Sequence, residues 1–512
     1  MSQPLFLMGI DHGTFRIKCA VFDPEGRELA AAFAAPTASS PVPGFCQRDP
    51  DAVWKKTCEV IQAAIARAGI SSRQIAGVSL CGYGGGLVLA GRDGQAVFPV
   101  ILSSDTRARQ QLQAFREDGR AGQIFSVTHQ RLWEGQAAPL LSWFREQAPS
   151  ALAKACFALP VKDWLRARLT GAVALERTDA SNLNLIDPRT GEFSDALFSL
   201  TCRGGERLLF DVPLLDSVAP AGRISRLAAR ETGLLEGTPV AAGLYDVSAC
   251  TLGCGALSPR TPAVTNGTWS MASCFSSSFE RADESTIVTV SALPGTFLLE
   301  QGSPTGTINL DWYLDQILQR MAPSMSRKQL YGLCARAAES YRGRTREDEA
   351  PFFVPFLFGD SEGKNRTGAF LNLCGNCRQE DLLYAVLEGI LLATRRHVRL
   401  LEKGGPPFTG AFLAGGFTGS RPTGQMLCDM LQIPLTISEG SQQGARGAAM
   451  CAGIVSGRFQ DLEQAARSMA RPAGVLSPHP GYWDYFQNRA ALYRQALAAL
   501  SVFHEKPAPS II

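Results

Sequence analysis

Two Gly-Thr turns, each set between apolar runs of strand length, constrain the fold of this chain more than any other feature. The first lies in MGIDHGTFRIKCAVFD, where the turn is expected over residues 11–14, and the second lies in TPAVTNGTWSMASCF at Gly267 and Thr268. Two apolar runs separated by a short glycine turn predict a β-hairpin. The two hairpins are separated by far more than the roughly 50 residues of a short structural repeat, so they indicate a duplicated domain and not a solenoid.

The segments that follow the two hairpins have a similar order. After the first hairpin, the turn PEGRE and the run LAAAFAA complete a meander, DPDAVWKKTCEV begins a helix, and the strand IAGVSL enters the glycine cluster CGYGGG. In the second half, a helix expected over about 379–403 leads into the strand AFLAGG and another glycine turn. The helix-rich region from about 107 to 175 is interpreted as an insertion into the first copy.

The length of the chain predicts two domains, because 512 residues are too many for one ordinary hydrophobic core. The boundary is expected near residue 256, directly after the segment GLYDVSACTLGCGA. The predicted domains therefore span 1–256 and 257–505.

The composition argues against several classes of partner. The chain has 50 Lys and Arg against 47 Asp and Glu, and no basic stripe alternates with aromatic residues, so neither nucleic acid nor a membrane surface is expected as a partner. The apolar run at 5–10 is too short for a signal sequence, and no stretch approaches a membrane span. The 14 cysteines are scattered, which favours reduced thiols and a cytoplasmic enzyme. Cys374 and Cys377 have CxxC spacing, but no second pair completes a zinc site, so inert thiols are favoured.

Asp11 is a candidate functional residue because its glycine turn could hold a phosphate. Glycine lets backbone N–H groups converge on an anion, and Thr14 adds a hydroxyl donor. A carboxylate beside polyphosphate is favourable only with a divalent cation between them, and Mg²⁺ is usually held in this way. The turn therefore predicts a site for a metal-nucleotide, with a carboxylate that merely caps the hairpin as the alternative.

Two other nucleotide-binding motifs are excluded by the sequence. The Walker pattern GxxxxGK[ST] does not occur. The glycine cluster CGYGGG lacks the full GxGxxG spacing, and the VLAGRDGQAV that follows predicts strand and turn where a dinucleotide site needs a helix.

Asp246 is the second candidate carboxylate, since it interrupts the small and apolar segment GLYDVSACTLGCGA. Burying a carboxylate there costs several kcal/mol unless the group is paired or has a function. The alternative is that Asp246 caps the N-terminus of the helix VSACTLGCG, although a cap at a cleft can also act as a base.

Taken together, a series of motifs makes the chain similar to the FGGY carbohydrate kinases, and within them to the L-xylulose kinases. The resemblance extends over nearly the whole chain and rests on the following segments: GIDHGTFRIKCAVFD, FCQRDPDAVW, VSLCGYGGGLVLAGRDGQAV with ILSSDTRA, KDWLRARLTG, GLYDVSA, NGTWS, AGGFTGSRPTGQMLCDMLQIPL and GARGAAMCAG. Each motif alone would be weak evidence.

The resemblance implies an α/β fold of two duplicated actin/Hsp70-like (ribonuclease H-like) domains with ATP in the cleft between them. It implies that Asp11 lies near Mg²⁺, through water, and near the γ-phosphate, and that Asp246 is the catalytic base that takes a proton from the sugar hydroxyl. The remaining residues that it assigns to the nucleotide are Gly13, Thr14 and Lys18 in the first hairpin, Gly267 and Thr268 in the second phosphate turn, and Gly415, Gly416 and Ser420 in AGGFTGS.

The sequence identifies the residues of the acceptor site less clearly than those of the nucleotide site. Xylulose kinases commonly carry a Met-His pair after the strand-end glycine, whereas this chain has Tyr83 and Gly84 there, which argues against an ordinary D-xylulose kinase. Sugar recognition needs several polar groups and often an aromatic face. The candidates besides Asp246 are Tyr83, Asp105, Arg107 and Trp133, with a surface ion pair for Arg107 and a core aromatic for Trp133 as the alternatives.

The function predicted from these features is ATP-dependent phosphorylation of a ketopentose, L-xylulose, to the 5-phosphate, in a protein that could form a homodimer. A kinase for erythritol or another short polyol is the alternative within the class. A sugar or nucleotide sensor without catalysis and an ATPase that acts on protein partners are alternatives from other classes. His12 is interpreted as turn filler, since this position varies in the family, and His397 as solvated on a basic helical face.

Overall fold

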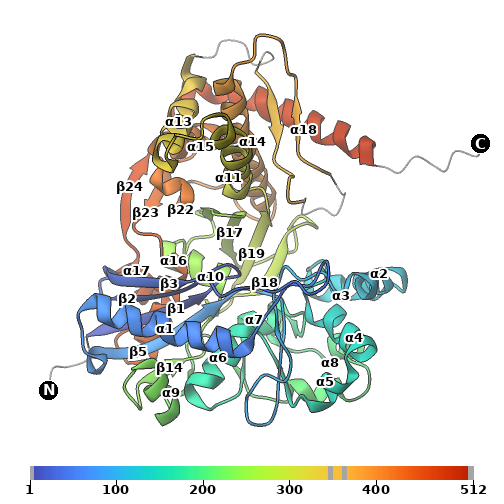
Figure 1. Ribbon diagram of the computed structural model, residues 1–512, viewed down its shortest axis with the longest axis vertical. Helices are drawn as coiled ribbons and strands as arrows, with labels where there is room; N and C mark the ends of the chain where they lie inside the picture. Colours follow the sequence, from blue (N-terminus) through green and yellow to red (C-terminus); the bar gives the residue numbers. More distant parts are fainter. Residues whose placement is uncertain (1–4, 344–349, 360–365, 505–512) are drawn as a thin grey trace, which may run out of the picture.

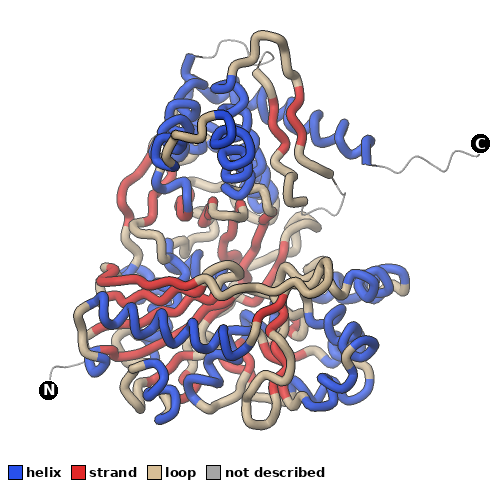
Figure 2. The backbone as a smooth tube through the Cα atoms, viewed as in Figure 1, coloured by secondary structure: helices blue, strands red, loops and turns tan. Residues whose placement is uncertain are grey.

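The computed structural model describes residues 5–343, 350–359 and 366–504. Two seven-stranded sheets, one in the wide lower part of Figure 1 and one in the narrower upper part, form the centre of the molecule. Figure 2 shows helices packed around both sheets, so that each sheet lies inside its own layered α/β unit. The α/β class predicted from the sequence is confirmed.

The first sheet has a core of N-terminal strands. Strands β1, β2 and β3 form the predicted antiparallel meander, and β1 also pairs in parallel with β5. The turn of the first hairpin is displaced from the predicted 11–14, because β1 continues to His12 and the Gly13 N–H donates to the Arg16 carbonyl oxygen. The strands of this sheet are β13 (Pro220–Arg223), β14 (Pro239–Ala241), β5 (Ile75–Gly82), β1 (Phe6–His12), β2 (Ile17–Phe22), β3 (Glu28–Ala34) and β15 (Leu244–Tyr245).

The second sheet repeats this arrangement with strands from the C-terminal half. The predicted hairpin around Gly267 is formed by β16 and β17, and β16 pairs in parallel with β22, as β1 pairs with β5. The strands, in their order across the sheet, are β18 (Ile287–Val290), β19 (Phe297–Ser303), β17 (Ser270–Ser276), β16 (Ala263–Asn266), β22 (Ala411–Gly415), β23 (Leu435–Ser438) and β24 (Pro472–Leu476).

Among the residues that the structure describes, five short two-stranded sheets lie outside these two. They are formed by β4 (Gln47–Arg48) with β7 (Val100–Ile101), β6 (Val88–Ala90) with β8 (Phe157–Leu159), β9 (Leu175–Glu176) with β12 (Leu214–Leu215), β10 (Ile186–Asp187) with β11 (Glu192–Phe193), and β20 (Phe352–Val354) with β21 (Ala369–Leu371). The strand β6 lies where the sequence predicted a strand and not a nucleotide-binding helix.

The first helix begins and ends where its sequence predicts. The Asp49 side chain accepts a hydrogen bond from the Asp51 N–H, Pro50 occupies the first helical position, and Gly69 ends the helix with a φ of 65°. Its apolar face includes Val53, and it packs against β2 and β3. Local sequence signals are therefore enough to define α1 (Pro50–Ala68).

The expected helical insertion lies beside the first sheet, at the lower right of Figure 1, and its helices pack around a small apolar core of their own. The helices of the first half are α2 (Arg109–Glu117), α3 (Arg120–Thr128), α4 (Ala137–Gln147), α5 (Pro149–Lys154), α6 (Val161–Thr170), α7 (Arg177–Asn182), α8 (Asp195–Thr201), α9 (Arg226–Thr232) and α10 (Asp246–Cys254). The helices of the second half are α11 (Thr307–Tyr313), α12 (Gln319–Met321), α13 (Arg327–Glu339), α14 (Gln379–Glu402), α15 (Arg421–Leu431), α16 (Gln443–Val455), α17 (Leu462–Met469) and α18 (Trp483–His504).

One element of the second half packs on the sheet of the first. Helix α16 contacts α10, β1 and β5, and one apolar cluster combines Leu7 and Ala20 of the first sheet with Ala445 and Met450 of α16. The two halves are therefore joined by a continuous buried layer, visible in Figure 1 where α10 and α16 lie between the sheets. The division at residue 256 remains a prediction, and its end at 505 lies outside the described residues.

Candidate active site

The two candidate carboxylates come together at one edge of the first sheet. In the parallel pairing, Asp11 of β1 is opposite Cys81 of β5, and Cys81 is in turn opposite Leu244 of β15. Asp246 follows Leu244 by two residues and begins α10. Because neighbouring strands are about 4.8 Å apart, this register brings the two acids to the same strand ends, where the charge of Asp11 acts on the ionisation of Asp246.

Asp11 is buried and has a fixed cationic partner. The Lys18 Nζ lies 3.1 Å from its Oδ2, across the hairpin that the sequence predicted. The charge of Asp11 is the largest influence on Lys18, and it raises the pKa of that amine above its usual value. On the other side of Asp11, a Cβ on Gly444 of α16 would lie 3.0 Å from the carboxylate oxygen, so only glycine keeps the space beside Asp11 open.

Asp246 is not the helix cap that the sequence left open. It is the first residue of α10, the preceding Tyr245 is the N-cap residue, and no side chain caps the helix. Burial raises the pKa of Asp246 well above its usual value, and the neighbouring carboxyl groups of Asp11 and Glu300 raise it further. A carboxylate with a raised pKa binds a proton more strongly, which suits a group that accepts a proton during a reaction.

The second Gly-Thr turn and the AGGFTGS segment meet in the same way in the second sheet. Asn266, which precedes Gly267, is opposite Gly415 in the parallel pairing of β16 and β22. The Gly267 carbonyl oxygen accepts from the Thr307 N–H at 2.7 Å, which anchors the turn to the start of α11. The Gly267–Thr268 turn remains partly exposed. Backbone N–H groups at such a turn, next to a helix start, can bind phosphate.

Ser420 caps a helix, which the sequence analysis did not predict. Its side chain is the N-cap of α15, accepting from the Thr423 N–H. Gly415 adopts a φ of 86° between β22 and the one-turn helix at Gly416–Gly419. The segment therefore places a tight glycine bend, directly after a parallel strand, beside the second phosphate turn.

Tyr83 and Trp133, two of the candidate acceptor residues, lie on the glycine cluster after β5. A Cβ on Gly85 would be 2.9 Å from the Trp133 ring, and the Tyr83 N–H donates to the His12 carbonyl oxygen at 3.2 Å. Tyr83 is buried, and its hydroxyl has no hydrogen-bond partner among the described residues. The structure therefore brings these two aromatic residues to the strand end that also carries Asp11.

Gly84 leaves room for the side chain of Asn182, which is not among the site residues predicted above. A Cβ at this position would lie 2.4 Å from the Asn182 Oδ1 and 2.6 Å from the Tyr245 ring. The side-chain amide nitrogen and oxygen of Asn182 are both buried and have no hydrogen-bond partner within the described part of the chain. Asn182 is the last residue of the helix α7, and the turn that follows is made by Asn184, which has a φ of 61°.

The candidates Asp105 and Arg107 form a buried ion pair, and not the surface pair considered for Arg107. The Arg107 Nε and Nη2 donate to the two Asp105 oxygens at 2.9 and 2.8 Å. The guanidinium lies 4.2 Å from the centre of the Phe45 ring and 4.9 Å from that of Trp143. This pair braces the loop before α2, and a role for it in sugar binding stays a prediction.

Two histidines had been interpreted incorrectly. His12 belongs to β1 and is fully buried, so it is not turn filler, and burial followed by the charge of Arg48 lowers its pKa to about 3. His397 is not solvated, because it is buried in α14 with its Nε2 2.7 Å from the Ser303 hydroxyl oxygen. In both cases a polar residue lies on the buried face of its element, which local sequence does not reveal.

A buried charge cluster behind Asp246 was also missed. The Lys162 Nζ lies 3.0–3.1 Å from oxygens of Asp163, Glu176 and Asp179, and all four side chains are almost completely buried. The Thr178 hydroxyl donates to Glu176 at 2.7 Å and accepts from the Tyr245 N–H at 2.9 Å. The cluster therefore connects directly to the residue that precedes Asp246. The motif KDWLRARLTG was the available signal, since it places Lys162 and Asp163 next to Val161, Trp164 and Leu165.

Glu300 of β19 is a third carboxyl group near Asp246. Its oxygens accept hydrogen bonds from the Tyr245 hydroxyl at 2.9 Å and from Thr289 at 3.3 Å. Burial raises the pKa of Glu300 to about 8, although these hydrogen bonds oppose the rise. Glu300 is therefore neutral in the folded protein at pH 7 but ionised in the unfolded chain.

This difference predicts a pH effect on stability that the Glu300→Gln variant should lack. Folding keeps a proton on Glu300 between about pH 4.5 and 8, so the contribution of this group to stability is full below that window and is lost across it, by roughly 1.4 kcal/mol per pH unit. We expect the variant to have a flatter dependence of the urea midpoint on pH from 5 to 8. The exposed Glu280→Gln change is the control, and equal slopes for Glu300→Gln and wild type would contradict the prediction.

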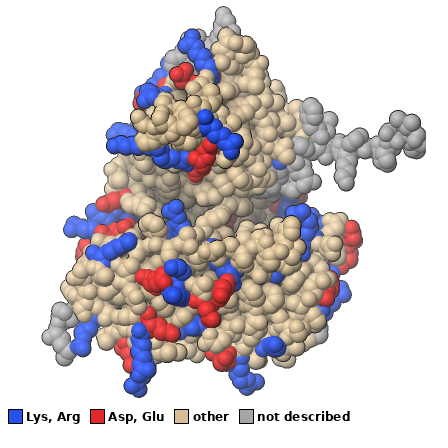
Figure 3. Space-filling view, in the orientation of Figure 1, with Lys and Arg blue, Asp and Glu red and all other residues tan. Residues whose placement is uncertain are grey.

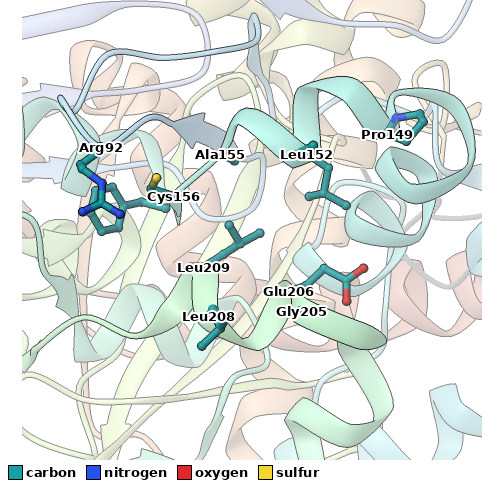
Figure 4. Close-up of a pocket in the computed structure, with 11 residues that line it drawn as sticks. Arg92, Pro149, Leu152, Ala155, Cys156, Gly205, Glu206, Leu208 and Leu209 are labelled. Carbon is teal, nitrogen blue, oxygen red and sulfur yellow. The ribbon is translucent and has the colours of Figure 1, made fainter.

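Three further features of the described residues bear on the site. The pocket in Figure 4, of about 710 Å³, lies between the insertion and the segments before and after it, with Arg92, Cys156 and Leu209 in its lining, and none of the predicted site residues lines it. On the face shown in Figure 3, positive and negative side chains are interspersed, and the surface is hollowed where the two parts of the molecule meet. Among the described helices, none is long and apolar enough to cross a membrane.

Comparison with known families decides the class of protein. The model of the N-terminal domain of the FGGY family of carbohydrate kinases matches residues 6–253, and that of the C-terminal domain matches residues 263–456. The chain belongs to the FGGY family of carbohydrate kinases. It is accordingly an ATP-dependent sugar phosphotransferase, which argues against a sensor without catalysis or an ATPase that acts on protein partners.

Individual relatives agree with the family assignment over nearly the full length. The chain is 28% identical to "L-xylulose/3-keto-L-gulonate kinase" of Escherichia coli K12, with 98% of both chains covered. It is 29% identical to "Probable L-xylulose kinase" of Pasteurella multocida, over 97% of this chain and 99% of the relative. The crystal structure of xylulose kinase from Rhodospirillum rubrum has the same fold, with a TM-score of 0.87, 22% identity, and 98% and 100% of the two chains covered.

The residues at the cleft fit a magnesium nucleotide. Asp11 supplies one buried carboxylate beside the space that Gly444 leaves open, and Lys18 supplies a cation in the same hairpin. Mg²⁺ typically binds through one or two carboxylates together with the phosphates of its nucleotide. In the described residues no group of three metal-ligating side chains exists that could hold a metal without such a partner.

Proposed function

We propose that this kinase phosphorylates a ketopentose, L-xylulose, at its terminal hydroxyl to give the 5-phosphate and ADP. The observation that carries the proposal is the register of β1, β5 and β15, which supports a site with Asp11 and Asp246 at one set of strand ends. Two of the relatives, an L-xylulose/3-keto-L-gulonate kinase and a probable L-xylulose kinase, support the choice of sugar. The replacement of an ordinary Met-His pair by Tyr83 and Gly84 supports a substrate other than D-xylulose.

In the proposed mechanism Asp246 is the general base. Its carboxylate accepts the proton of the sugar hydroxyl as that oxygen attacks the γ-phosphorus, and the raised pKa of Asp246 favours this transfer. The Tyr245 side chain, held by Glu300, and its backbone N–H, held by Thr178, keep the start of α10 in position. Tyr83 and Trp133 would contact the carbon skeleton of the sugar.

The phosphates would bind between the two Gly-Thr turns. Gly13, Thr14 and Lys18 would act from the first domain, and Gly267 and Thr268 from the second. Asp11 would hold Mg²⁺ through water, and that cation would neutralise part of the phosphate charge. Gly415 and Gly416 lie beside Asn266, which precedes the second turn, and together with Ser420 they would face the nucleoside. A site divided between two domains is completed when they close, which excludes water and limits wasteful ATP hydrolysis.

A substrate panel with purified protein and Mg-ATP tests this proposal. ADP release should show kcat/KM for L-xylulose at least tenfold above that for D-xylulose, erythritol and xylitol. Omitting Mg²⁺ should abolish turnover with every acceptor. A clear preference for an alditol over every ketose would overturn the proposed substrate.

A further inference from the structure

The CxxC pair of Cys374 and Cys377 has no part in the proposed kinase reaction, and the structure does not fit the inert thiols that the sequence favoured. The pair lies in the segment between β21 and the start of α14. All 14 cysteines of the chain lie within the described residues, and Cys374 is the only one of them that is exposed. Cys377 is partly exposed. The pair is therefore within reach of reagents in solution.

A tight turn holds the two sulfur atoms together. The Cys377 N–H donates to the Cys374 carbonyl oxygen at 3.1 Å, which closes a turn with Gly375 and Asn376 at its centre. The ends of such a turn have Cα atoms less than about 7 Å apart, close to the separation that a disulfide requires. The two Sγ atoms are themselves 3.1 Å apart. A bond between them therefore needs only local adjustment of the two side chains.

The turn also leaves space around the two thiols. A Cβ on Gly375 would have no atom within 4 Å, and the neighbouring residues Leu373, Asn376 and Arg378 are exposed. A thiol reacts with a disulfide only when the attacking and attacked sulfur atoms can align, so access matters as much as ionisation. This segment offers such access, unlike the buried cysteines of the two sheets, such as Cys19 and Cys274.

The hydrogen bonds of the turn distinguish the two thiols. The Cys377 Sγ accepts from the Cys374 N–H at 3.4 Å, and a donor directed at sulfur stabilises the thiolate, which is the form that attacks a disulfide. The Cys374 thiol donates to the Asn376 Oδ1 at 2.7 Å, and its hydrogen bond with Cys377 raises the pKa of Cys374. Cys377 is therefore better suited to attack first, and Cys374 to react second.

We propose that Cys374 and Cys377 form a redox modification site, at which a small disulfide such as oxidised glutathione converts the two thiols reversibly into an intramolecular disulfide. The Cys377 thiolate attacks one sulfur of the reagent, whose S–S bond breaks and releases a thiolate that takes up a proton. Cys374 then gives up its proton and attacks the Cys377 Sγ, which breaks the mixed disulfide and releases the second thiol. The protein loses two electrons and two protons, and the reagent gains them. None of these steps involves the proposed sugar or nucleotide residues, so the inference does not depend on the proposed function.

The experiment equilibrates the purified full-length protein with mixtures of reduced and oxidised glutathione, blocks the remaining thiols with N-ethylmaleimide, and measures peptide masses after digestion with trypsin. Cleavage after Arg366 and Arg378 gives the peptide TGAFLNLCGNCR, which contains both cysteines of the pair and no other. The variants are Cys374→Ser and Cys377→Ser, each of which leaves one thiol of the pair. The control is Cys202→Ser, which removes a partly exposed thiol at the end of α8.

We expect the peptide from oxidised wild type to be lighter than the dithiol peptide by two hydrogen atoms and to carry neither maleimide nor glutathione. Excess dithiothreitol should restore both thiols, and Cys202→Ser should behave as wild type. Cys374→Ser should accumulate glutathione on Cys377 to a level at least about tenfold above that in wild type, because the thiol that resolves the mixed disulfide is absent. The oxidised fraction of wild type should not depend on protein concentration, since the disulfide forms within one chain.

Other results would overturn the inference. Two maleimide-labelled cysteines in the wild-type peptide, even in the most oxidising mixture, would make the pair inert. Stable glutathione adducts on wild type without the internal disulfide would show that the two sulfur atoms cannot pair. A disulfide that joins two copies of the chain, seen as a dimer on a non-reducing gel, would also contradict a site within one chain. Accumulation of the adduct in Cys377→Ser and not in Cys374→Ser would refute the proposed order of attack.

Discussion

Replacing Asp246 by Asn should lower kcat by about 10²–10⁴-fold while the protein stays folded and binds its sugar. Asn has almost the same shape but cannot accept the proton of the attacking hydroxyl, and general-base catalysis typically contributes a factor of this size. Asn also removes a carboxyl group whose burial is unfavourable, so the fold should not lose stability. Steady-state ADP release measures kcat, and calorimetric titration with sugar measures binding.

The matched control is Asp216→Asn, because Asp216 is an exposed acid in the same domain. This variant should keep wild-type turnover. A kcat for Asp246→Asn within threefold of wild type would remove Asp246 from the mechanism. In wild type, turnover should also decline on the acid side with an apparent pKa above the ordinary aspartate value, since burial and neighbouring carboxyl groups raise the pKa of Asp246.

Replacing Lys162 by Met should lower the free energy of unfolding by about 3–5 kcal/mol, because Glu176 and Asp179 lose their buried cation, whereas Asp163 keeps Arg166. Burial by itself would lower the pKa of Lys162, but attraction to Asp163, Glu176 and Asp179 outweighs it and raises the pKa above the usual value. The amine is therefore charged in the fold, and its loss cannot be compensated by water. Urea unfolding followed by fluorescence measures the effect.

Two further variants separate the ionic effect from the loss of volume. Lys56→Met removes an exposed lysine that pairs with Glu59, and it should change stability by less than about 1 kcal/mol. Adding Asp179→Asn to Lys162→Met should recover part of the lost stability, since it removes a buried carboxyl group that has lost its cation and whose pKa burial raises to about 8. A Lys162→Met protein as stable as wild type would show that the cluster does not depend on this lysine.

Several elements could be predicted from short stretches of sequence because short-range physics defines them. The helix α1 follows from its Asp-Pro start and its glycine end, and the hairpins β1–β2 and β16–β17 follow from apolar runs around a Gly-Thr turn. The turn of the first hairpin was displaced because β1 continues to His12, and pairing with a neighbouring strand decides where a strand ends.

The candidate site was only partly visible in the sequence. Asp11 and Asp246 stand out as acids in apolar segments, and the type of residue suggests the chemistry. Arg107 looked like a possible sugar ligand or surface residue, but Phe45 and Trp143, from other segments, enclose it. Asn182 and Glu300 gave no local signal, because their importance lies in which partners are near them or absent.

The amino-acid sequence alone determined the duplicated hairpins, the α/β class, the two acids and the family to which the chain belongs, since these depend on local periodicity, turn residues and motifs. Only the tertiary structure decided that residues 11, 81 and 244 share one row across a parallel sheet. It also decided that Gly444 of α16, from the end of the chain, lies directly beside Asp11. Such neighbours depend on strand register and on the packing of distant elements, which no local pattern of residues encodes.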